Sequence, residues 1–487
     1  MKPTDEQKTI IESTGPACVD AVAGSGKTSL LVQYAKARPR QRILCLTFNR
    51  SVKLLNQQRF LAAGCKNVRV ETGHSLGYAN VVPAGRYKIA KNGLALTDIV
   101  GLCGLSNIDP AEQMIFAGHI YRALVFFCNV ATTSFSSLDY TCCPTSPAAR
   151  EFAQIHHDEI IGHARFLLGE MYQRRLPLIH DAYLKFFQLQ KPNLSGFDVI
   201  MVDEAQDIGG SMLDVYMRQP ADLILVGDAH QSIYGFRHAV NAMAMAPYPH
   251  FPLSTSFRFG PEIASLAKKI LRMKRSVEPS SRVPGIRGAG PADLGQSHAV
   301  LARGNLQLIK EAMAVVTKNA GAKLHFEGGL QSYTCLGEGS SLFDILHLRT
   351  GRRSQIRSAF IASFPDYQAL EHYIEATNDQ ELRLAAKIVD EYSLLLFDLV
   401  RRLKAAQVER KDAEITFSTV HKAKGFEYDQ VELVEGFIDR EMLSSIKRKL
   451  IENDDSAPPK EAVLEEINIL YVAATRAAKK LTIDFEI

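Results

Sequence analysis

The sequence lacks several features that would assign a class of protein at once. Its 487 residues include no tryptophan, and its eight cysteines show no Cys-x-x-Cys spacing, which excludes a common zinc-site pattern and a disulfide scaffold. No apolar run approaches the roughly 18 residues that a membrane span needs. The segment MKPTDEQKTI lacks the charged-then-apolar order of a signal peptide. We therefore expect a cytoplasmic, intracellular protein with reduced thiols and no membrane role.

The charge balance gives little guidance to function. Lysine and arginine outnumber aspartate and glutamate only slightly, which gives a formal net charge of +4. Nucleic-acid binding therefore cannot be inferred from net charge and must be argued from local placement. The length and the 46% hydrophobic content allow about two to four domains with sizeable cores. The evidence for function has to come from local motifs.

The clearest motif is AVAGSGKT, which lies between the small-residue run CVDAVA and the helical pattern TSLLVQYAKA. Gly24 and Gly26 let the backbone N–H groups of this loop, with that of Ser25, surround phosphate oxygens at a helix N-terminus. Lys27 would then reach the terminal phosphates, and Thr28 would ligate Mg²⁺. The alternative is a glycine-rich turn before a helix. The run Gly-Ser-Gly-Lys-Thr favours the phosphate loop and predicts ATP as cofactor.

A second motif, DEAQD, follows the apolar run FDVIMV, which is typical of a buried strand. Asp203 at this strand end would hold Mg²⁺ through water, and Glu204 would orient and deprotonate an attacking water molecule. A lone Asp-Glu pair at a strand end is more often a solvated cap. Together with the phosphate loop it predicts hydrolysis as well as binding.

A third strand pattern, ADLILV, runs into GDAHQSIYGFRH. The amide of Gln231 suits a nucleotide γ-phosphate, whereas Tyr234 and Phe236 with Arg237 suit stacked bases and a sugar-phosphate backbone. This segment is therefore predicted to couple the two kinds of ligand.

The motifs VDEAQD, GDAHQSIYGFRHA, STSFRFG, STVHKAKGFEYD and EEINILYVAATRA follow the phosphate loop in this order. In this order the chain resembles superfamily 1A helicases of the UvrD/Rep type, and within them the F-box DNA helicases, although no F-box segment is recognisable. His238 stands where relatives often have glycine. The resemblance implies ATP and Mg²⁺ as cofactors and single-stranded or tailed duplex DNA as the nucleic-acid partner.

The resemblance also assigns roles to individual residues. Gln7 would read the adenine and Phe257 would stack on it, while Glu427 would contact the ribose. Arg258 and Arg476 would act as arginine fingers; without the surrounding motifs each would be interpreted as a surface or salt-bridge arginine. The residues implied to line a channel for single-stranded DNA are Phe48, Asn49, Thr72, His74, Tyr234, Phe236, Arg237 and His421. For Phe48, which follows the apolar run ILCL, the alternative is a core aromatic.

The expected fold class is α/β, with two RecA-like, parallel-sheet, P-loop motor domains and a mainly helical insertion in the first. Residues 1–80 and 191–255 would form the first motor domain, because the phosphate loop and VDEAQD must meet at adjacent strand ends. Residues 81–190 would form the accessory insertion, whose histidines and cysteines fit no zinc pattern. Residues 256–487 would form the second motor domain, with a reduced or absent second accessory subdomain.

The resulting functional prediction is an ATP-dependent DNA helicase or translocase with 3′→5′ polarity. It would unwind duplexes or displace bound proteins, such as a recombinase filament, in DNA repair or recombination, and would be nucleoid-associated in a prokaryote. The alternative is a DNA-stimulated regulatory ATPase or sensor subunit of a larger assembly, for example an antiviral defence complex. An RNA substrate also stays open, because stacking and phosphate contacts do not separate RNA from DNA.

Overall fold

The computed structural model describes residues 2–144, 146–235, 238–293, 295–319, 321–334, 342–452, 454 and 457–487. Within these ranges the N-terminal half is built on a parallel sheet with the strand order β3-β2-β4-β6-β1-β8. Its strands are β1 (Ala17–Ala21), β2 (Ile43–Thr47), β3 (Val68–Thr72), β4 (Val199–Asp203), β6 (Asp222–Gly227) and β8 (His250–Leu253). They are short apolar runs, and β2 and β4 are buried at every position, as expected for a sheet covered on both faces.

The C-terminal half contains a second parallel sheet with the order β12-β13-β11-β14-β15. Its strands are β11 (His298–Ala302), β12 (Leu324–Phe326), β13 (Ile415–Thr419), β14 (Tyr428–Leu433) and β15 (Ala477–Ile483). Two short pairs lie outside these sheets: antiparallel β5 (Ile208–Gly209) with β7 (Ala239–Val240), and parallel β9 (Thr255–Ser256) with β10 (Arg287–Gly288). The expected α/β class with two parallel-sheet motor units is confirmed.

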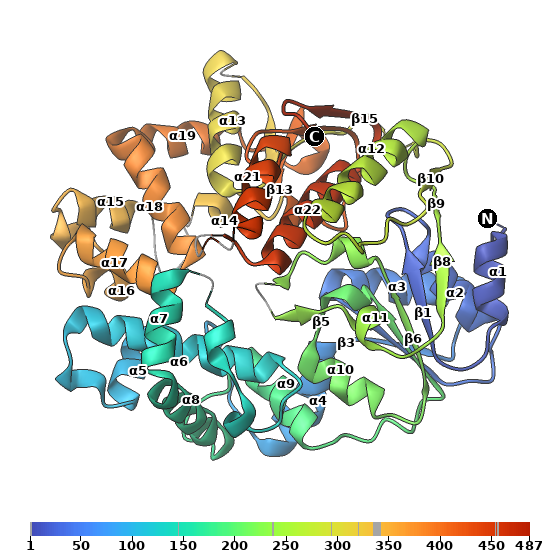
Figure 1. Ribbon diagram of the computed structural model, residues 1–487, viewed down its shortest axis with the longest axis horizontal. Coiled ribbons are helices and arrows are strands. Elements are labelled where there is room, and N and C mark those ends of the chain that lie inside the picture. Colours follow the sequence, from blue (N-terminus) through green and yellow to red (C-terminus); the bar gives the residue numbers. More distant parts are fainter. Residues whose placement is uncertain are drawn as a thin grey trace.

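Helices flank the two sheets. Those of the first sheet are α1 (Asp5–Glu12), α2 (Lys27–Lys36), α3 (Arg50–Ala62), α10 (Gly210–Met217) and α11 (Ala242–Met245). Those associated with the second half are α12 (Pro261–Arg272), α13 (Asn305–Lys318), α14 (Gln331–Thr334), α20 (Val420–Ala423), α21 (Arg440–Ile451) and α22 (Lys460–Ala474). Figure 1 shows the two motor units on one side of the molecule, with α22 lying between the second sheet and the first.

Two helical blocks lie on the other side of the molecule (Figure 1). The first helical block, between β3 and β4, consists of α4 (Gly73–Gly85), α5 (Leu96–Leu102), α6 (Pro110–Asn129), α7 (Pro147–Ile155), α8 (His157–Tyr172) and α9 (His180–Leu189). The second helical block, between β12 and β13, consists of α15 (Leu342–Arg349), α16 (Ala359–Ala362), α17 (Tyr367–Thr377), α18 (Gln380–Tyr392) and α19 (Leu396–Ala406). The predicted domain boundaries stay a prediction.

Helix α6 joins the two helical blocks. Met114 and Ile115 belong to the hydrophobic core of the second helical block, and a Cβ placed on Gly118 would lie only 3.1 Å from the Tyr373 hydroxyl of α17. The His119 Nε2 lies 2.9 Å from the Ala376 carbonyl oxygen. The helical blocks are therefore packed against each other through shared core residues and a close helix contact.

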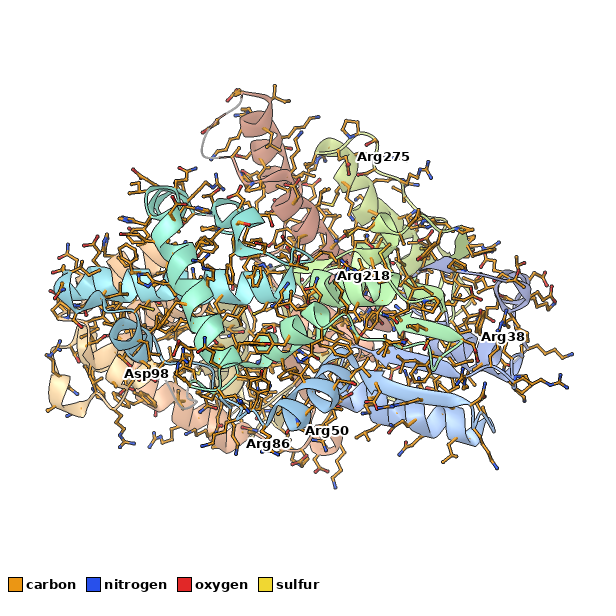
Figure 2. The ribbon with its side chains drawn as sticks, turned by 90° about the horizontal axis from the view of Figure 1, so that it is seen from below. Arg38, Arg50, Arg86, Asp98, Arg218 and Arg275 are labelled. Atoms are coloured by element: carbon orange, nitrogen blue, oxygen red, sulfur yellow. The ribbon has the colours of Figure 1, made fainter. Side chains whose placement is uncertain are left out.

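Exposed arginines are not confined to one element of the fold. Arg50, Arg86, Arg218 and Arg275 are exposed, come from separate elements and are spread over the molecule in Figure 2. No helix in the described part of the chain is both long and apolar enough to cross a membrane. A functional site therefore has to be located from cavities and buried charges.

Candidate functional site

The carboxyl ends of β1, β4 and β6 meet at one edge of the first sheet, because these parallel strands are neighbours in the order β4-β6-β1. The phosphate loop follows β1, the segment DEAQD begins at the last residue of β4, and GDAHQ begins at the last residue of β6. This edge is where α/β proteins of this kind bind ligands. The sequence-predicted motifs are thus brought together by the strand order.

The phosphate loop has the backbone geometry that its glycines predict. Gly24 and Gly26 have φ angles of 72° and 79°, in the left-handed region that glycine adopts without steric cost. A Cβ on Gly24 would lie 2.6 Å from the Cβ of Arg258, so a larger residue does not fit. Among the described residues, the buried Ser25 hydroxyl has no hydrogen-bond partner. An unpaired hydroxyl beside the N-terminus of α2 fits a phosphate ligand.

A cavity of about 860 Å³, here the phosphate-loop cavity, opens at this edge and is lined by Lys27, Thr28, Asp203, Glu204 and Arg258. The Lys27 Nζ lies 3.1 Å from the Glu204 Oε1. Burial alone would lower the pKa of Lys27, but the charges of Glu204, Asp228 and Asp203 outweigh it and raise this pKa. Lys27 therefore stays charged in the cavity.

The two carboxyl groups after β4 differ in their electrostatics. Burial raises the pKa of Asp203, and the charge of Glu204 acts in the same direction. Burial would also raise the pKa of Glu204, but the charges of Lys27 and Lys424 outweigh it and hold this pKa below its usual value. Among the described residues no group of three or more His, Cys, Asp and Glu side chains could hold a metal ion. Mg²⁺ bound with phosphates needs only one or two protein ligands, and Asp203 with Thr28 fits that requirement.

The two predicted finger arginines both line the phosphate-loop cavity. The Arg258 Nη2 donates to the Glu427 Oε1 at 2.5 Å, and its Nη1 donates to the Thr475 carbonyl at 2.8 Å. The Arg476 Nη2 donates to the Gln231 Oε1 at 3.3 Å. Burial lowers the pKa of Arg476 to about 9, and the neighbouring Arg258 charge acts in the same direction. Glu427, predicted to contact a ribose, is paired with Arg258 in the structure.

Gln231 connects both halves of the site. Its Nε2 donates to the Asp228 Oδ2 at 2.8 Å, and the same oxygen accepts from the Tyr471 hydroxyl at 3.1 Å. Tyr471 lies on α22 of the second motor unit, as Arg476 follows that helix. The turn after β6 is therefore bound to the second motor unit directly through the Gln231 Oε1 and also through Asp228, which accepts from both Gln231 and Tyr471.

Sequence reasoning missed Lys424, although it lies within the motif HKAKGFEYD. Its Nζ forms an ion pair with the Asp207 carboxylate and a hydrogen bond to the Gln231 carbonyl oxygen, and it lies 5.0 Å from the centre of the Tyr234 ring. Both Lys424 and Asp207 are almost fully buried. The one feature of the sequence that could have indicated it is the second lysine of HKAKGFEYD, a motif whose other residues were assigned to strand and ribose contacts.

Gln7 and Phe257 lie at one end of the phosphate loop. A Cβ on Gly26 would have the Gln7 Nε2 at 3.4 Å and the Phe257 Cδ2 at 3.9 Å. The Gln7 Oε1 accepts the Thr4 backbone N–H at 3.1 Å in the capping box of α1. The helix cap thus fixes the amide beside the loop, where both residues were predicted to contact the adenine.

The predicted strand-binding aromatics are brought together next to the phosphate-loop cavity. The rings of Phe48 and Tyr234 are stacked, with centroids 5.2 Å apart and planes at 18°. Both line a second cavity of about 680 Å³, here the aromatic cavity, together with Asn49 and His74. Phe48 is 37% exposed, so its ring is accessible, which does not favour the alternative of a core aromatic.

Other predicted strand residues are placed differently. Thr72 is the N-cap of α4, and its hydroxyl accepts the Ser75 N–H at 2.9 Å, so it is engaged in helix capping. The His421 Nε2 lies 3.1 Å from the Ile233 carbonyl oxygen, and its own carbonyl accepts from the Tyr234 hydroxyl at 3.1 Å. Phe236 and Arg237 lie outside the described residues.

Helix α22 holds the loop that carries Tyr234. The Asn468 Nδ2 donates to the Ser232 carbonyl at 2.8 Å, and the Glu465 Oε1 accepts the Gly235 N–H at 3.0 Å. A Cβ on Gly235 would lie 2.6 Å from the Glu465 Oε2. Helix α22 of the second motor unit therefore holds this loop of the first motor unit through two hydrogen bonds.

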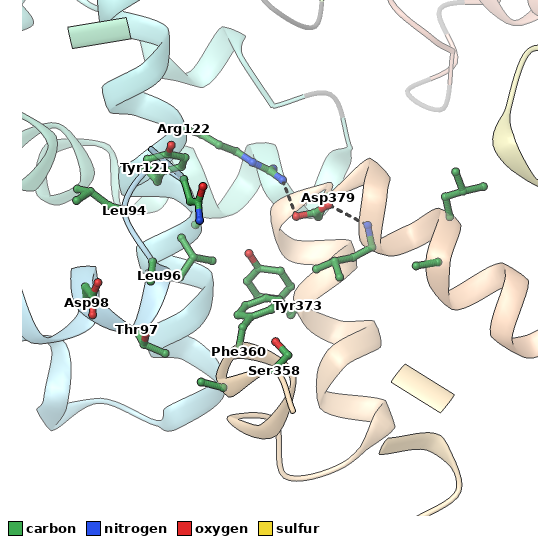
Figure 3. Close-up of a pocket in the computed structure, with 18 of the residues that line it drawn as sticks. Leu94, Leu96, Thr97, Asp98, Tyr121, Arg122, Ser358, Phe360, Tyr373 and Asp379 are labelled. Atoms are coloured by element: carbon green, nitrogen blue, oxygen red, sulfur yellow. Dashed lines mark hydrogen bonds and ion pairs between the residues drawn. The ribbon is translucent and has the colours of Figure 1, made fainter. Parts of the chain in front are cut away.

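A third cavity of about 1190 Å³, here the inter-block cavity, lies between the two helical blocks. Figure 3 shows Arg122 of the first helical block reaching toward Asp379 of the second, with Tyr373 and Phe360 below them. The Arg122 Nη2 and the Asp379 Oδ2 are 3.7 Å apart. Lys422 of α20 also lines this cavity, which therefore combines aromatic rings with cations.

Two known families match this chain. Residues 7–237 match the family described as AAA domain, and residues 347–486 match the UvrD-like helicase C-terminal domain. Together these ranges cover more than half of the chain and contain the phosphate loop, DEAQD, HKAKGFEYD and the segment around Arg476. The chain is therefore similar to AAA domains in its N-terminal part and to UvrD-like helicases in its C-terminal part.

Two individual relatives extend the match over almost the whole chain, and a third matches 58% of it. The F-box DNA helicase 1 of Gallus gallus is 29% identical over 517 residues, which cover 99% of this chain and 49% of that protein. The F-box DNA helicase protein 1 of Schizosaccharomyces pombe is 28% identical, over 99% of this chain and 57% of that protein. The UvrD2 ATP-dependent DNA helicase of Mycobacterium tuberculosis is 27% identical over 58% of this chain and 47% of that protein. The chain thus spans about half the length of these relatives.

Proposed function

We propose that this UvrD-like chain is an ATP-dependent motor that moves along single-stranded DNA with 3′→5′ polarity. It would unwind tailed duplexes or displace bound proteins during DNA repair or recombination. The observation that carries the proposal is that the phosphate-loop cavity and the aromatic cavity share one wall. The residues that line both are Phe48, Asn49, Asp203, Glu204, Asp207 and Tyr234.

The shared wall supports a specific nucleotide chemistry. Thr28 and Asp203 would hold Mg²⁺, which would neutralise charge on the phosphates. Burial and the charge of Glu204 raise the pKa of Asp203, and the charge of Lys27 opposes them. Lys27 would leave Glu204 for the phosphates of ATP. Glu204 would then be free to orient a water molecule and accept its proton.

The second motor unit would complete the site when the cleft closes. Arg258 and Arg476 already face the phosphate loop, and a planar, permanently charged guanidinium suits the charge that develops on a transferred phosphoryl group. Arg476 is also bonded to Gln231, so its movement toward the γ-phosphate would shift the turn after β6. This linkage makes closure of the cleft the motor step.

Lys424 offers a route from the nucleotide to the strand. It bridges Asp207 and the Gln231 carbonyl on the nucleotide side and lies against the ring of Tyr234 on the other. A base stacked on Tyr234 or Phe48 would contribute about 1–3 kcal/mol independent of its sequence. Movement of Lys424 toward phosphate charge would therefore change its contact with the Tyr234 ring at the stacking site.

The strand would leave the aromatic cavity toward the inter-block cavity. Arg122 and Lys422 supply cations there, and Phe360 and Tyr373 supply aromatic surfaces (Figure 3). Cations along a groove with interleaved rings are typical of proteins that bind single strands without sequence preference. A recombinase filament is the proposed target of displacement.

The test is a strand-displacement assay on duplexes with 3′ tails, 5′ tails and RNA tails, each with and without ATP. The proposal predicts displacement only with a 3′ DNA tail and ATP, together with hydrolysis that single-stranded DNA stimulates. Hydrolysis that neither DNA nor RNA changes would reject the motor. Hydrolysis stimulated by DNA without any displacement would instead indicate a regulatory ATPase or sensor within a larger assembly.

A further inference from the structure

A fourth cavity of about 550 Å³, here the rear cavity, lies behind the turn that carries Gln231. Two of its lining residues come from opposite motor units. His230 belongs to the short helical turn η5 (Ala229–Gln231) after β6, and Lys274 belongs to η7 (Met273–Ser276), which continues α12. Lys274 is only 7% exposed. A buried lysine between two moving units needs a structural or functional reason, because burial of its charge is costly.

Lys274 and His230 form a direct hydrogen bond. The Lys274 Nζ lies 2.9 Å from the His230 Nδ1. Burial lowers the pKa of His230 to about 4, and the Lys274 charge acts in the same direction, so the ring is neutral near pH 7. Burial lowers the pKa of Lys274 to about 8, so the ammonium is still charged there. Lys274 is therefore the donor, and the ring proton is confined to Nε2.

His230 is in turn fixed to the catalytic turn. Its backbone N–H donates to the Asp228 Oδ1 at 3.0 Å, and its ring packs edge-on against Tyr471 with centroids 6.1 Å apart. The other oxygen of Asp228 accepts from the Gln231 amide and from the Tyr471 hydroxyl. A short series of hydrogen bonds thus runs from Lys274 to Gln231, which is the neighbour of His230 in the chain.

We propose that Lys274 is a positioning residue for ATP hydrolysis, which holds η5 through His230 so that the Gln231 amide faces the phosphate-loop cavity. This inference rests on the motor function proposed above. Lys274 contacts neither the phosphate loop nor the predicted metal ligands, so it would act on the rate of hydrolysis while the binding of ATP is largely preserved.

The proposal predicts a pH dependence. Above about pH 8 Lys274 loses its proton, the Nδ1 of His230 is no longer held by a charged donor, and the turn is less firmly placed. Asp228 and Glu278 face the ammonium and favour its charged form, but they are outweighed by burial. Among the described residues, Asp20 and Arg282 also line the rear cavity, and Tyr471 contacts the His230 ring.

The test compares the parent chain with Lys274→Met, Lys274→Arg and the control Lys269→Met, which replaces an exposed lysine of α12. ATP hydrolysis with single-stranded DNA is measured from pH 6.5 to 9.5, as kcat and KM for ATP.

In the parent chain and the control, kcat should fall through about pH 8. In Lys274→Met, kcat should be about tenfold lower at neutral pH, with KM for ATP nearly unchanged, and it should show no fall centred near pH 8, only the later fall near pH 9 that loss of the Arg476 charge gives in every variant. Lys274→Arg should retain kcat through pH 8, since the rear cavity has room for a guanidinium.

Each result decides the matter. Equal kcat and equal pH profiles in the parent chain and Lys274→Met, with DNA stimulation intact in both, would overturn the inference and leave the motor function standing. Absence of DNA-stimulated hydrolysis in the parent chain would reject the motor function and this inference with it. If Lys274→Met melts too early to assay, Lys274→Arg decides, because a profile that still falls through pH 8 would contradict the role of Lys274.

Discussion

Lys27 and Glu204 form an ion pair across the phosphate-loop cavity, with the Lys27 Nζ 3.1 Å from the Glu204 Oε1. The two side chains predicted to bind phosphate and to activate water therefore neutralise each other in the structure. A nucleotide has to compete with Glu204 for Lys27, and this competition releases the carboxylate when ATP binds. The ion pair would thus keep Glu204 inactive until the phosphates arrive.

Glu204→Gln is expected to slow ATP hydrolysis by about 10²–10⁴-fold, the usual contribution of a general base. ATP should bind more tightly to this variant than to the parent chain, because Lys27 is no longer held by a carboxylate. Single-turnover hydrolysis and equilibrium binding of a fluorescent ATP analogue measure the two effects separately. Glu262→Gln, at an exposed position of α12, is the control. Hydrolysis within tenfold of the parent rate would show that Glu204 is not the base.

Arg476→Lys tests whether a guanidinium is needed at the second motor unit. Lysine keeps the charge but cannot reproduce the separate bonds from Arg476 to the Val472 carbonyl, the Phe426 carbonyl and the Gln231 amide. We expect hydrolysis to fall by about 10³-fold, as for loss of an arginine finger, while ATP affinity changes little.

The control for this variant is Arg440→Lys, since Arg440 is exposed and paired with Glu486 at the surface. Steady-state hydrolysis and thermal unfolding should be measured for both variants. A loss of activity in Arg476→Lys that is matched by a proportionate fall in melting temperature would assign Arg476 to structure instead of catalysis.

The strand ends of this protein were predictable from the sequence, whereas the contacts between the motor units were not. Apolar runs followed by GSGKT and DEAQD placed Lys27 and Glu204 at one sheet edge, because the strands of one parallel sheet all end at the same edge. The partner of Lys424 could not be predicted, since Asp207 lies far away in the chain and belongs to the other motor unit. The same limit applies to the Lys274–His230 pair.

Loop conformation was also beyond prediction from sequence. His238 lies in the loop after β6, at the position where the helicases that the sequence resembles often have glycine. In the structure His238 has a φ angle of 59°, in the region that glycine prefers, and its ring packs against Phe126 with centroids 4.8 Å apart. A contact with the first helical block thus accompanies a backbone conformation that most residues avoid. A pattern of residue types does not contain that tertiary contact.

Lys185 gives a prediction about stability and pH. It is fully buried on α9, where its Nζ donates to the Val130 carbonyl, the Thr132 carbonyl and the Gln188 amide oxygen. Burial lowers its pKa to about 8 from the ordinary value of 10.5. Between these pH values the unfolded chain binds more protons than the folded protein, so the free energy of unfolding rises with pH.

Lys185→Met removes this titration and leaves the three oxygen acceptors unpaired, which should destabilise the protein by roughly 1–3 kcal/mol at pH 7. The difference in the free energy of unfolding between Lys185→Met and the parent chain should grow by about 2 kcal/mol between pH 7 and pH 10. Urea unfolding at several pH values measures it, with the exposed Lys36→Met as control. A deficit that is constant with pH would mean that Lys185 keeps an ordinary pKa in the folded protein.

The stack of Phe48 on Tyr234 predicts different outcomes for two substitutions at one position. Tyr234→Phe keeps the ring for stacking and loses only the hydroxyl that donates to the His421 carbonyl, so stimulation of hydrolysis by single-stranded DNA should stay within about twofold of the parent.

Tyr234→Ala removes the ring, which should weaken strand binding by about 1–3 kcal/mol. It should also lower DNA stimulation and translocation while ATP affinity without DNA stays largely intact. Fluorescence anisotropy with labelled oligonucleotides and hydrolysis at saturating ATP measure these effects. If Tyr234→Ala matches the parent chain in strand affinity, stimulation and movement, the aromatic cavity is not the strand site, and the shared wall loses its role in coupling.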